Sequence, residues 1–314
     1  MRCDSCLSEA IVDRPYAHDH ACERHLLESV RDRARREWHR QLRSFSRGTI
    51  AVALSGGKDS SAALELTHRY FARRPGVRLV AITIDEGIAG YRSASVARAG
   101  ELAGRLGIEH EVRSVREELG TTTDAAAERL AGRAPCSFCG VWRRGLLNRA
   151  ARAHGADALV LGFNLDDLAQ TVLMNLARGE VERIGRMSPH ATRRPGLVPR
   201  LAPLATVPER EVYLYARTLG LPFDHSECPH AGAAERNVFR EVVWRLEAAR
   251  PGTRQALLRT REAIEELLKA RPEAAALMAC TLCGEPSSHP VCRSCAFLRD
   301  PGHPVIVPPV SGRA

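Results

Sequence analysis

A short apolar run that ends in two glycines constrains this chain more than any other feature. Residues 49–54 read TIAVAL, the next six read SGGKDS, and the helical pattern SAALELTHRY follows. A strand, a glycine turn and a helix in that order bind an anion, because backbone N–H groups and the positive end of the helix point toward it. The pattern is not a Walker A motif, which would require glycine where Val52 stands.

The side chains of this loop also suit phosphate. Ser55 and Ser60 carry hydroxyls that can donate to phosphate oxygens, and Lys58 neutralises phosphate charge. Of the 46 lysines and arginines in the chain, only Lys58 and Lys269 are lysines. A compact ammonium fits a crowded phosphate site better than a planar guanidinium does. The sequence therefore predicts a phosphate site at residues 55–60.

Further β-like runs at 78–84, 108–115 and 158–163 alternate with helical patterns at 93–106 and 138–154. This alternation predicts an α/β fold with a doubly wound, mostly parallel sheet. Such sheets bind ligands at the carboxyl ends of their strands. Three polar clusters follow strand ends here, at residues 55–60, 85–87 and 164–167.

The third cluster has two interpretations. Asn164 is placed to cap a helix over residues 165–178, with Asp166 and Asp167 in its first turn. In the structural interpretation the two acids only complement the helix dipole. In the functional one, one of them binds Mg²⁺ or orients ATP. The residues alone leave both open.

The chain has ten cysteines. The redox state of the cellular compartment decides whether they are thiols or disulfides. The N-terminus, MRCDSCLSEA, lacks the apolar stretch of a secretory signal, so we expect a cytoplasmic protein with reduced thiols. No apolar run approaches the roughly 18 residues of a transmembrane helix, and we expect no membrane role. Reduced cysteines point to metal ligands or catalytic thiols rather than to disulfides.

Seven of the cysteines fall into two sets with the spacing of structural zinc sites. Two pairs near the start give three thiolates and an imidazole, and two C-x2-C pairs near the end give four thiolates. A closed shell of four ligands leaves no position for substrate, so both sites should be structural. The predicted zinc ligands are Cys3, Cys6, Cys22 and His25, and then Cys280, Cys283, Cys292 and Cys295.

Three cysteines remain without an obvious fourth ligand: Cys136, Cys139 and Cys228. Three thiolates could hold a [4Fe-4S] cluster with one open iron, could hold a zinc ion with one open position, or could include a redox pair that passes a persulfide. They could also be incidental thiols. An incomplete ligand set favours reactive chemistry over a structural role.

At this point the chain resembles the PP-loop ATP pyrophosphatases and, within them, the TtuA and Ncs-type tRNA 2-thiouridine synthetases. The resemblance covers almost the whole chain through the N-terminal cysteine set, SGGKDS, TIDEGI, PCSFCGVWRR, GFNLDDLAQTVLMNLARGE, ECPH and the terminal ribbon, in that order. It implies that ATP adenylates the C2 oxygen of a tRNA uridine, pyrophosphate leaves, and sulfur displaces AMP.

The resemblance also implies roles for particular residues. Ser55, Gly56, Gly57, Lys58, Asp59 and Ser60 would hold the ATP phosphates, Ile84 and Asp85 would lie near the adenosine, and Gly162 would line the pocket. Asp167 would position Mg²⁺·ATP or the uridine. Cys136, Cys139 and Cys228 would ligate a [4Fe-4S] cluster. We therefore predict that the phosphate loop and these three thiols open onto one shared cavity.

Two positions depart from the family pattern. The family often has histidine before the asparagine of the third cluster, whereas this chain has Phe163, so no imidazole role can be assigned there. Some members carry a lysine near Arg143, and arginine keeps the positive charge but not a titratable amine. The catalytic candidates are accordingly Lys58, Asp59, Asp167 and Arg143.

A net charge of +9 and a pI near 9.3 fit a polyanionic partner, here tRNA. Residues 31–47 contain seven arginines, and a second group comprises Arg183, Arg186, Arg193, Arg194 and Arg200. Both segments are candidate tRNA tracks. Family analogy adds a homodimer and a thiocarboxylated, ubiquitin-like sulfur carrier protein as expected partners.

The predicted organisation has four parts: a zinc finger over residues 1–27, an arginine-rich helix or linker over 28–47, the PP-loop catalytic domain over 48–270, and a zinc ribbon with a tail over 271–314. Two other functions fit parts of the sequence. One is an amide-forming PP-loop ligase, which needs no cluster, and the other is a non-catalytic zinc-ribbon RNA-binding protein. The sequence does not identify which tRNA uridine is modified or what donates the sulfur.

Overall fold

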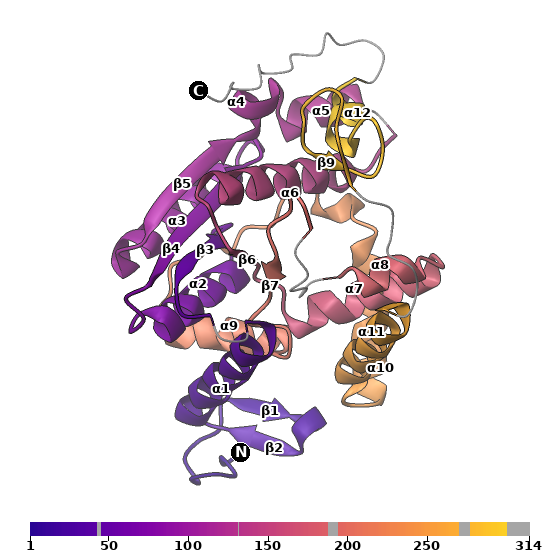
Figure 1. The fold of residues 1–314 in the computed structure, drawn as a ribbon. Helices are drawn as coiled ribbons and strands as arrows, with labels where there is room; N and C mark the ends of the chain where they lie inside the picture. The colour runs from indigo at the N-terminus through magenta and orange to yellow at the C-terminus, as the bar shows by residue number, and fades with distance from the viewer. Residues whose placement is uncertain (43–44, 131, 188–193, 270–276, 300–314) are drawn as a thin grey trace.

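The computed structural model describes residues 1–42, 45–130, 132–187, 194–269 and 277–299. Its centre is a five-stranded parallel sheet in the order β5-β4-β3-β6-β7, as the alternating pattern predicts (Figure 1). The strands are β3 (Gly48–Ala53), β4 (Val77–Asp85), β5 (Glu109–Ser114), β6 (Ala158–Val160) and β7 (Arg200–Leu201).

The sheet grows in two directions from β3, which places a switch point between β3 and β6. Ile50 of β3 is opposite Leu79 of β4 on one side and Ala158 of β6 on the other. At such a point the loops after neighbouring strands diverge and leave a crevice for a ligand. The two loops here are residues 55–60 and residues 161–164.

Alternate residues of the buried strands supply two separate cores. Ile50 and Val52 belong to a core with α1 (Glu23–Gln41), α2 (Lys58–Phe71), α3 (Arg92–Leu106) and α9 (Glu209–Thr218). Ala51, Val80 and Ile82 face the opposite core, which α6 (Pro135–Ala153) covers together with α4 (Val115–Leu119) and α5 (Thr123–Arg129). Successive strand residues point to opposite faces, so the sheet is covered by helices on both sides.

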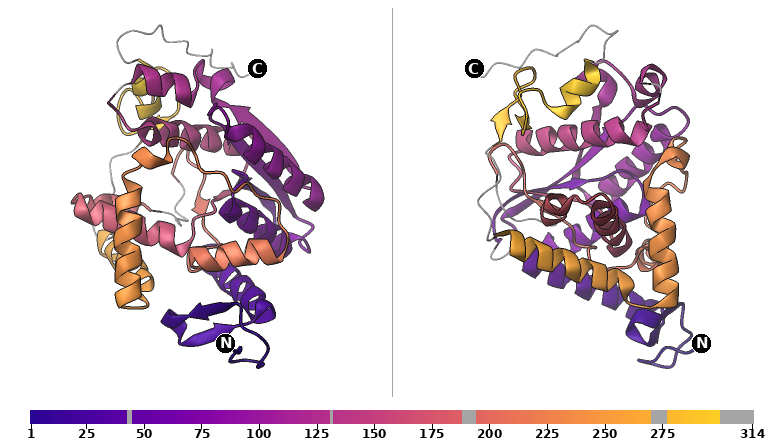
Figure 2. Two further views of the ribbon diagram at one scale, coloured as in Figure 1. Left: turned by 180° about the vertical axis from the view of Figure 1, so that it is seen from behind. Right: turned by 90° about the vertical axis from the view of Figure 1, so that its right-hand side faces the viewer.

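A group of helices beside the sheet has its own core. It consists of α7 (Leu165–Ala177), α8 (Val181–Gly185), α10 (Arg236–Ala249) and α11 (Thr253–Lys269) (Figure 2). Leu165, Leu168 and Val172 of α7 are buried against Leu258 of α11. The short helix η2 (Ala231–Ala233) lies just before α10 in the chain. The described residues contain no helix both long and apolar enough to span a membrane.

Small modules lie at opposite ends of the molecule (Figure 1). The N-terminal one pairs β1 (Val12–Arg14) with β2 (Asp19–Ala21) around η1 (Pro15–Ala17). The C-terminal one pairs β8 (Met278–Ala279) with β9 (Pro286–Ser287) and ends in α12 (Arg293–Leu298). Phe297 of α12 packs edge-on against Phe138 of α6, with ring centroids 6.1 Å apart, so the second module is attached to the sheet through α6.

Besides shifts of a single residue at several element boundaries, three differences from the sequence predictions are larger. Helix α6 begins at Pro135, three residues before its predicted start, because proline is favoured in the first helical turn. Strand β6 ends at Val160 rather than at residue 163. Strand β7 has only two residues and leaves no periodic signal in the sequence.

Candidate active site

Hydrogen bonds of its two serines fix the conformation of the loop over residues 55–60. Ser60 Oγ accepts a hydrogen bond from the Ser55 backbone N–H over 3.1 Å, lies 2.9 Å from Ser55 Oγ, and donates to the Gly57 carbonyl oxygen over 3.0 Å. Gly57 caps α2, and no side chain accepts a hydrogen bond from the first N–H groups of that helix. The unsatisfied N–H groups and the helix dipole together form an anion site.

Two glycines make this geometry possible. Gly56 has a φ of +85°, and a Cβ there would lie 1.9 Å from the carbonyl oxygen of Ser95. A Cβ on Gly162, after β6, would lie 2.8 Å from the backbone nitrogen of Ser60. Any larger residue at Gly162 would push the start of α2 away, so the two loops of the switch point are in direct contact.

Lys58 lies between two carboxylates. Its Nζ is 2.9 Å from Asp59 Oδ2 and 2.7 Å from Glu209 Oε1. Burial alone would lower the pKa of Lys58, but the two acids outweigh burial and raise it to about 12. The sequence did not single out Glu209, which lies 151 residues away at the start of α9. A phosphate arriving at Lys58 therefore competes with Glu209.

Asn164 joins the loop to α7, and the predicted cap is confirmed. Its side chain accepts from the Asp167 N–H, the Asp167 carboxylate accepts from the Asn164 N–H, and Asn164 Nδ2 donates to Asp59 Oδ1 over 3.0 Å. Burial raises the pKa of Asp59. Burial, assisted by the nearby Asp59 carboxylate, raises the pKa of Asp167 to about 6. Two acids with elevated pKa values lie together at the mouth of the loop.

The neighbouring Asp166 has a different environment. It accepts from Arg254 Nη1 and from the Glu209 backbone N–H, both over 2.7 Å. These partners leave Asp166 with a structural role, in which it fastens α9 and α11 to α7. Asp167, in contrast, has its backbone carbonyl oxygen bonded by Arg236 over 3.2 Å, while its carboxylate lies 3.7 Å from that guanidinium.

Ile84 and Asp85 end β4, next to the phosphate loop. The Ile84 carbonyl oxygen accepts from Arg92 Nη2 over 2.5 Å, and Asp85 Oδ1 accepts from the Gly87 N–H over 2.8 Å. Asp85 thus stabilises the turn after β4. Phe163, at the position where the family often has histidine, is 38% exposed.

A buried glutamate from the predicted polar cluster at residues 85–87 and a buried arginine that the sequence did not single out join the loop to α6. Arg92 Nη1 donates to the Ser55 carbonyl oxygen over 3.1 Å, and Arg92 Nε lies 2.6 Å from Glu86 Oε2. The other oxygen of Glu86 lies 3.2 Å from Arg143 Nη1. Arg92 and Glu86 are 4% and 3% exposed. Glu86 therefore holds Arg143 in an ion pair, which connects the phosphate loop to the α6 surface.

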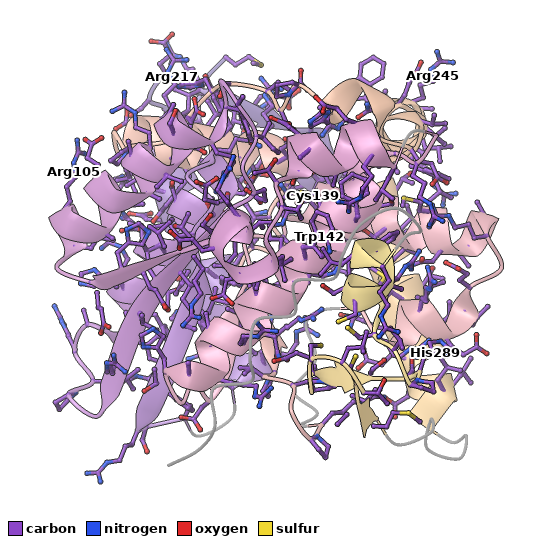
Figure 3. The ribbon with its side chains drawn as sticks, turned by 90° about the horizontal axis from the view of Figure 1, so that it is seen from above. Arg105, Cys139, Trp142, Arg217, Arg245 and His289 are labelled. Carbon is purple, nitrogen blue, oxygen red and sulfur yellow. The ribbon has the colours of Figure 1, made fainter. Side chains whose placement is uncertain are left out.

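The three thiols outside the four-ligand sets gather at the start of α6. Cys136 and Cys139 are three residues apart in its first turns, and Figure 3 labels Cys139. Cys228 lies just before η2, which contacts α6. Cys136 interacts electrostatically with both Cys139 and Cys228. Cys136 is exposed and Cys139 is buried, and burial raises the pKa of both Cys139 and Cys228.

The spacing of these thiols differs from that of a mononuclear site. Among the described residues, only the two terminal sets form groups whose ligand atoms all lie within 4.8 Å of one another. A four-iron cluster is larger than a single ion and holds its thiolates farther apart. Three looser thiols at a helix N-terminus, where the dipole favours negative charge, fit such a cluster.

The segment from Pro222 to Cys228 runs from the phosphate loop to the thiols. The Asp224 N–H donates to the Gly56 carbonyl oxygen over 2.8 Å, and Ser61 Oγ donates to the Pro222 carbonyl oxygen over 3.1 Å. Four residues of extended chain span at most about 14 Å. The α-carbon of Cys228 therefore lies no farther than that from the α-carbon of Asp224. Whether loop and thiols share one cavity stays a prediction.

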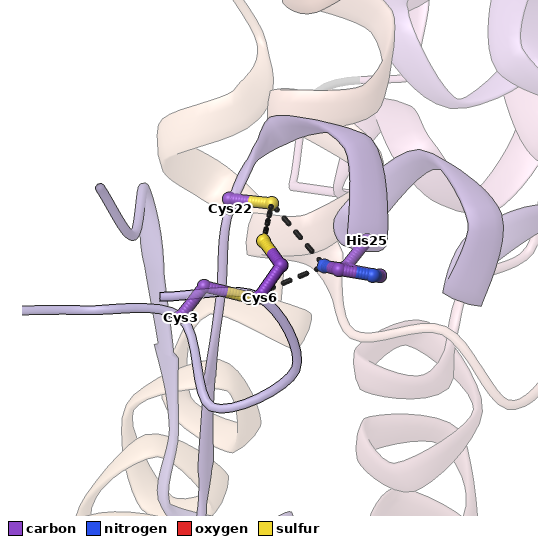
Figure 4. A group of neighbouring side chains, drawn as sticks. All are labelled: Cys3, Cys6, Cys22 and His25. Carbon is purple, nitrogen blue, oxygen red and sulfur yellow. Dashed lines mark hydrogen bonds between the residues drawn. The ribbon is translucent and has the colours of Figure 1, made fainter. Parts of the chain in front are cut away.

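The two four-ligand sets are compact. Cys6 Sγ lies 3.6 Å from Cys22 Sγ, and His25 Nδ1 lies 3.3 Å from the sulfur atoms of both Cys3 and Cys22 (Figure 4). In the second set Cys283 Sγ lies 3.6 Å from Cys292 Sγ. These separations match the edges of a tetrahedron around an ion with bonds of about 2.0 to 2.3 Å, so both sets can hold a metal ion.

The chain shares its organisation with proteins of one family. The PP-loop domain model matches residues 30–247. The tRNA 2-thiolation protein NcsA of Haloferax volcanii is 38% identical over 95% of this chain and 98% of its own length. Cytoplasmic tRNA 2-thiolation protein 1 of Chlamydomonas reinhardtii is 34% identical over 95% of this chain and 83% of its own.

A solved structure matches along the whole fold. It is that of the U34-tRNA thiolase NcsA from Methanococcus maripaludis with its [4Fe-4S] cluster. The match has a TM-score of 0.83 at 31% identity and covers 96% of this chain and 97% of the other. The chain therefore belongs to the PP-loop family and, within it, to the tRNA 2-thiolation proteins of the TtuA and Ncs type.

Proposed function

We propose that this protein is an ATP-dependent tRNA-uridine 2-sulfurtransferase that uses a [4Fe-4S] cluster. The observation that carries the proposal is the connection between the phosphate loop and the three thiols at the start of α6. Arg92, Glu86 and Arg143 form that connection. An activating site and a sulfur site must be adjacent, because the activated uridine has to meet sulfur before water reaches it.

The phosphate loop would bind ATP through its own residues. The N–H groups of Gly56, Gly57 and Lys58, with the hydroxyls of Ser55 and Ser60, would face the phosphates. Lys58 would exchange Glu209 for a phosphate oxygen and keep its proton throughout, because its pKa is about 12. Ile84 and Asp85 would border the adenosine, and Gly162 would line the pocket. Asp59 and Asp167 would hold Mg²⁺, for which carboxylate oxygens are suitable ligands.

The reaction has two displacement steps. The C2 oxygen of uridine attacks the α-phosphorus of ATP. The bond between that phosphorus and the bridging oxygen breaks, and pyrophosphate leaves with its electron pair. Sulfide then attacks C2, and AMP departs with the former C2 oxygen, so the product carries a C2 thiocarbonyl. Lys58 would stabilise the charge that develops on pyrophosphate. A cluster on Cys136, Cys139 and Cys228 would supply an iron with an open position for sulfide. Arg143, held by Glu86, would place positive charge between the phosphate loop and the three thiols.

The remaining expectations rest on the chemistry of the donor sets and on the relatives. Zn²⁺ would occupy both four-ligand sets, because three or four thiolates in a closed shell suit this ion. The Chlamydomonas reinhardtii relative is described as cytoplasmic, which supports the same location here. We also retain a homodimer and a thiocarboxylated, ubiquitin-like sulfur donor as expected partners.

The test is the nucleoside composition of tRNA in a strain that lacks this protein and is complemented with variants. The wild-type protein should restore 2-thiouridine, measured by mass spectrometry, and anaerobically purified protein should be brown, with iron, labile sulfide and two zinc ions. Cys228→Ser should lose iron and thiolation and should keep both zinc ions. Ser226→Ala, two residues away, is the matched control and should thiolate normally.

Each alternative function has its own signature in this experiment. Full thiolation by Cys228→Ser would show that the three-thiol interpretation is wrong. Conversion of ATP to AMP with no thionucleoside would favour an amide-forming ligase. Binding of RNA without any ATP turnover would favour the non-catalytic RNA-binding protein.

A further inference from the structure

A large cavity among the described residues lies not at the phosphate loop but beside α6, against the C-terminal module. It has a volume of about 1110 Å³ and lies between α6, β7 and the C-terminal module. Trp142 of α6 forms part of its wall and donates to the Ser294 carbonyl oxygen over 3.5 Å (Figure 3). We call this cavity the ribbon groove. Its size far exceeds the roughly 30 Å³ that one water molecule occupies, so its natural occupant is an extended group.

The lining of the ribbon groove is strongly cationic. Eight of its lining residues are arginines, and the two acids are Glu118 and Glu285. Both acids lie toward one end. Glu118 accepts from Arg113 over 2.7 Å and from Arg149 over 3.1 Å, and Glu285 accepts from Arg149 over 3.1 Å and from Arg152 over 3.3 Å. That end is close to electrically neutral.

Elsewhere in the groove Arg183 lies 2.8 Å from Glu180, but three further arginines have no such compensation. Within the described part of the chain, no carboxylate lies in ion-pair distance of Arg144, Arg200 or Arg293. Burial, together with the positive charges of Arg143, Arg200 and Arg293, lowers the pKa of Arg144 to about 10. Burial also lowers the pKa of Arg200. These arginines repel one another in the free protein, and an anion between them would relieve the repulsion.

The arginine-rich helix α1 differs from the groove. Arg33 pairs with the buried Glu211, Arg40 lies 2.7 Å from Glu37, and Arg35 lies 3.2 Å from Asp32. Charges that already have partners contribute less to binding a polyanion. Of the two segments that the sequence nominates, the structure leaves the one containing Arg200 more open to an anion. Arg193 of that segment and Arg43 of the other lie outside the described residues.

We propose that the ribbon groove holds the phosphate backbone of the substrate tRNA, with Arg144, Arg200 and Arg293 contacting phosphate groups. This inference rests on the proposed function and adds the binding surface to it. Guanidinium groups bind phosphate oxygens in a bidentate manner. Five residues of α6 separate Arg144 from Cys139, which corresponds to about 7.5 Å along the helix axis. RNA in the groove therefore passes close to the three-thiol site.

The test compares two double variants with the same charge change. Arg144→Gln/Arg200→Gln alters the groove, and Arg35→Gln/Arg36→Gln alters the exposed face of α1. Binding of an unmodified tRNA transcript is measured by fluorescence anisotropy over a series of KCl concentrations, with ATP binding as the check on folding. We expect the groove variant to lose roughly 10-fold in affinity per arginine and to reduce the salt slope by about one per arginine. The α1 variant should stay within about 2-fold of wild type.

Two outcomes overturn the proposal. If the groove variant binds tRNA as tightly as the wild type does, the groove does not bind tRNA. If that variant has instead lost binding to an acidic partner protein, the groove binds protein rather than RNA. A larger loss in the α1 variant assigns the tRNA to α1. If the groove double variant does not fold, Arg293→Gln in the C-terminal module is compared with Arg35→Gln alone. Failure of wild-type protein to bind tRNA would refute the proposed function itself, which distinguishes the two failures.

Discussion

The phosphate loop and the ribbon groove both concentrate charge, but they arrange it in opposite ways. In the loop, Lys58 lies within 2.9 Å of one carboxylate and 2.7 Å of another. In the described part of the groove, Arg144 and Arg200 have no carboxylate in ion-pair distance, and the positive charges of Arg143, Arg200 and Arg293 act on Arg144. Paired charges hold a site in its working geometry before the ligand arrives. Unpaired like charges repel one another and make the free protein less stable. When an anion binds between them, this repulsion is relieved and the relief favours binding.

This difference has consequences for binding. When a ligand binds the loop, its contact with Lys58 replaces that of Glu209. The electrostatic free energy gained is only the difference between these two contacts. A ligand of the groove gains the full relief of repulsion, and the gain is screened by salt. We therefore expect ATP binding to depend weakly on ionic strength and tRNA binding to depend on it steeply.

The largest expected effect comes from removing the paired cation. Lys58→Ala should lower ATP-dependent adenylation by on the order of 100- to 1000-fold, the usual cost of losing one charge-stabilising donor. It should also destabilise the free protein, because Asp59 and Glu209 would face each other without a cation. Pyrophosphate release and thermal unfolding measure the two effects. Lys58→Arg keeps the charge and should restore stability better than it restores activity. Unchanged pyrophosphate release in Lys58→Ala would contradict the assignment of the loop as the phosphate site.

The second prediction concerns the acids of the loop and pH. The pKa of Asp167 in the folded protein is about 6, above its ordinary value of 3.8, so the folded state binds this proton more tightly than the unfolded state. The free energy of unfolding should therefore fall as pH rises from about 4 to 6. Nucleotide binding with Mg²⁺ should show the opposite trend, because a cation needs the ionised carboxylate.

Substitution separates the two trends. Asp167→Asn should flatten both pH profiles, raise the melting temperature above pH 6 and lower activity by on the order of 10- to 100-fold. Asp166→Asn is the matched control, because Asp166 binds Arg254 and α9. It should lose stability and retain the pH profile. An unchanged pH profile in Asp167→Asn would show that another group titrates.

The smallest effect is expected in the groove of the free protein. Arg144→Gln removes one repelling charge and should raise stability by about 0.5 kcal/mol, or about 1 to 2 °C in melting temperature. Added KCl should stabilise the wild type by a similar amount and the variant by less. A loss of stability in Arg144→Gln would mean that this arginine has an attractive partner and that the contrast with the loop is wrong.

Local patterns accounted for much of the fold and for the core of the site. The run before SGGKDS is β3, the predicted alternation gives the parallel sheet, and Asn164 caps α7 through the expected side-chain bonds. The two four-ligand sets are grouped as their spacing indicated. In each case the interacting residues are close in sequence, or the rule concerns neighbouring strands, so spacing alone constrains the geometry.

Other parts of the site depend on residues far apart in the chain. Glu209 reaches Lys58 across 151 residues, and the groove brings α6 against a module more than 130 residues later. The ion pair between Glu86 and Arg92 spans only six residues, yet its role depends on Ser55 and Arg143, which other elements supply. Such acids and arginines have no local signature, because many exposed pairs look the same in sequence.

The amino-acid sequence by itself determined the strand-loop-helix phosphate site, the sheet and the metal-ligand sets, because each arises from backbone conformation and short spacing. Tertiary structure alone decided which charges are paired. Lys58 and Arg144 are both cations at the starts or sides of helices that cover the same sheet, yet packing gives Lys58 two carboxylates and places Arg144 near other arginines. Electrostatic energy depends on distance and burial rather than on order along the chain, so only the folded protein distinguishes a charge that holds the site together from one that awaits a ligand.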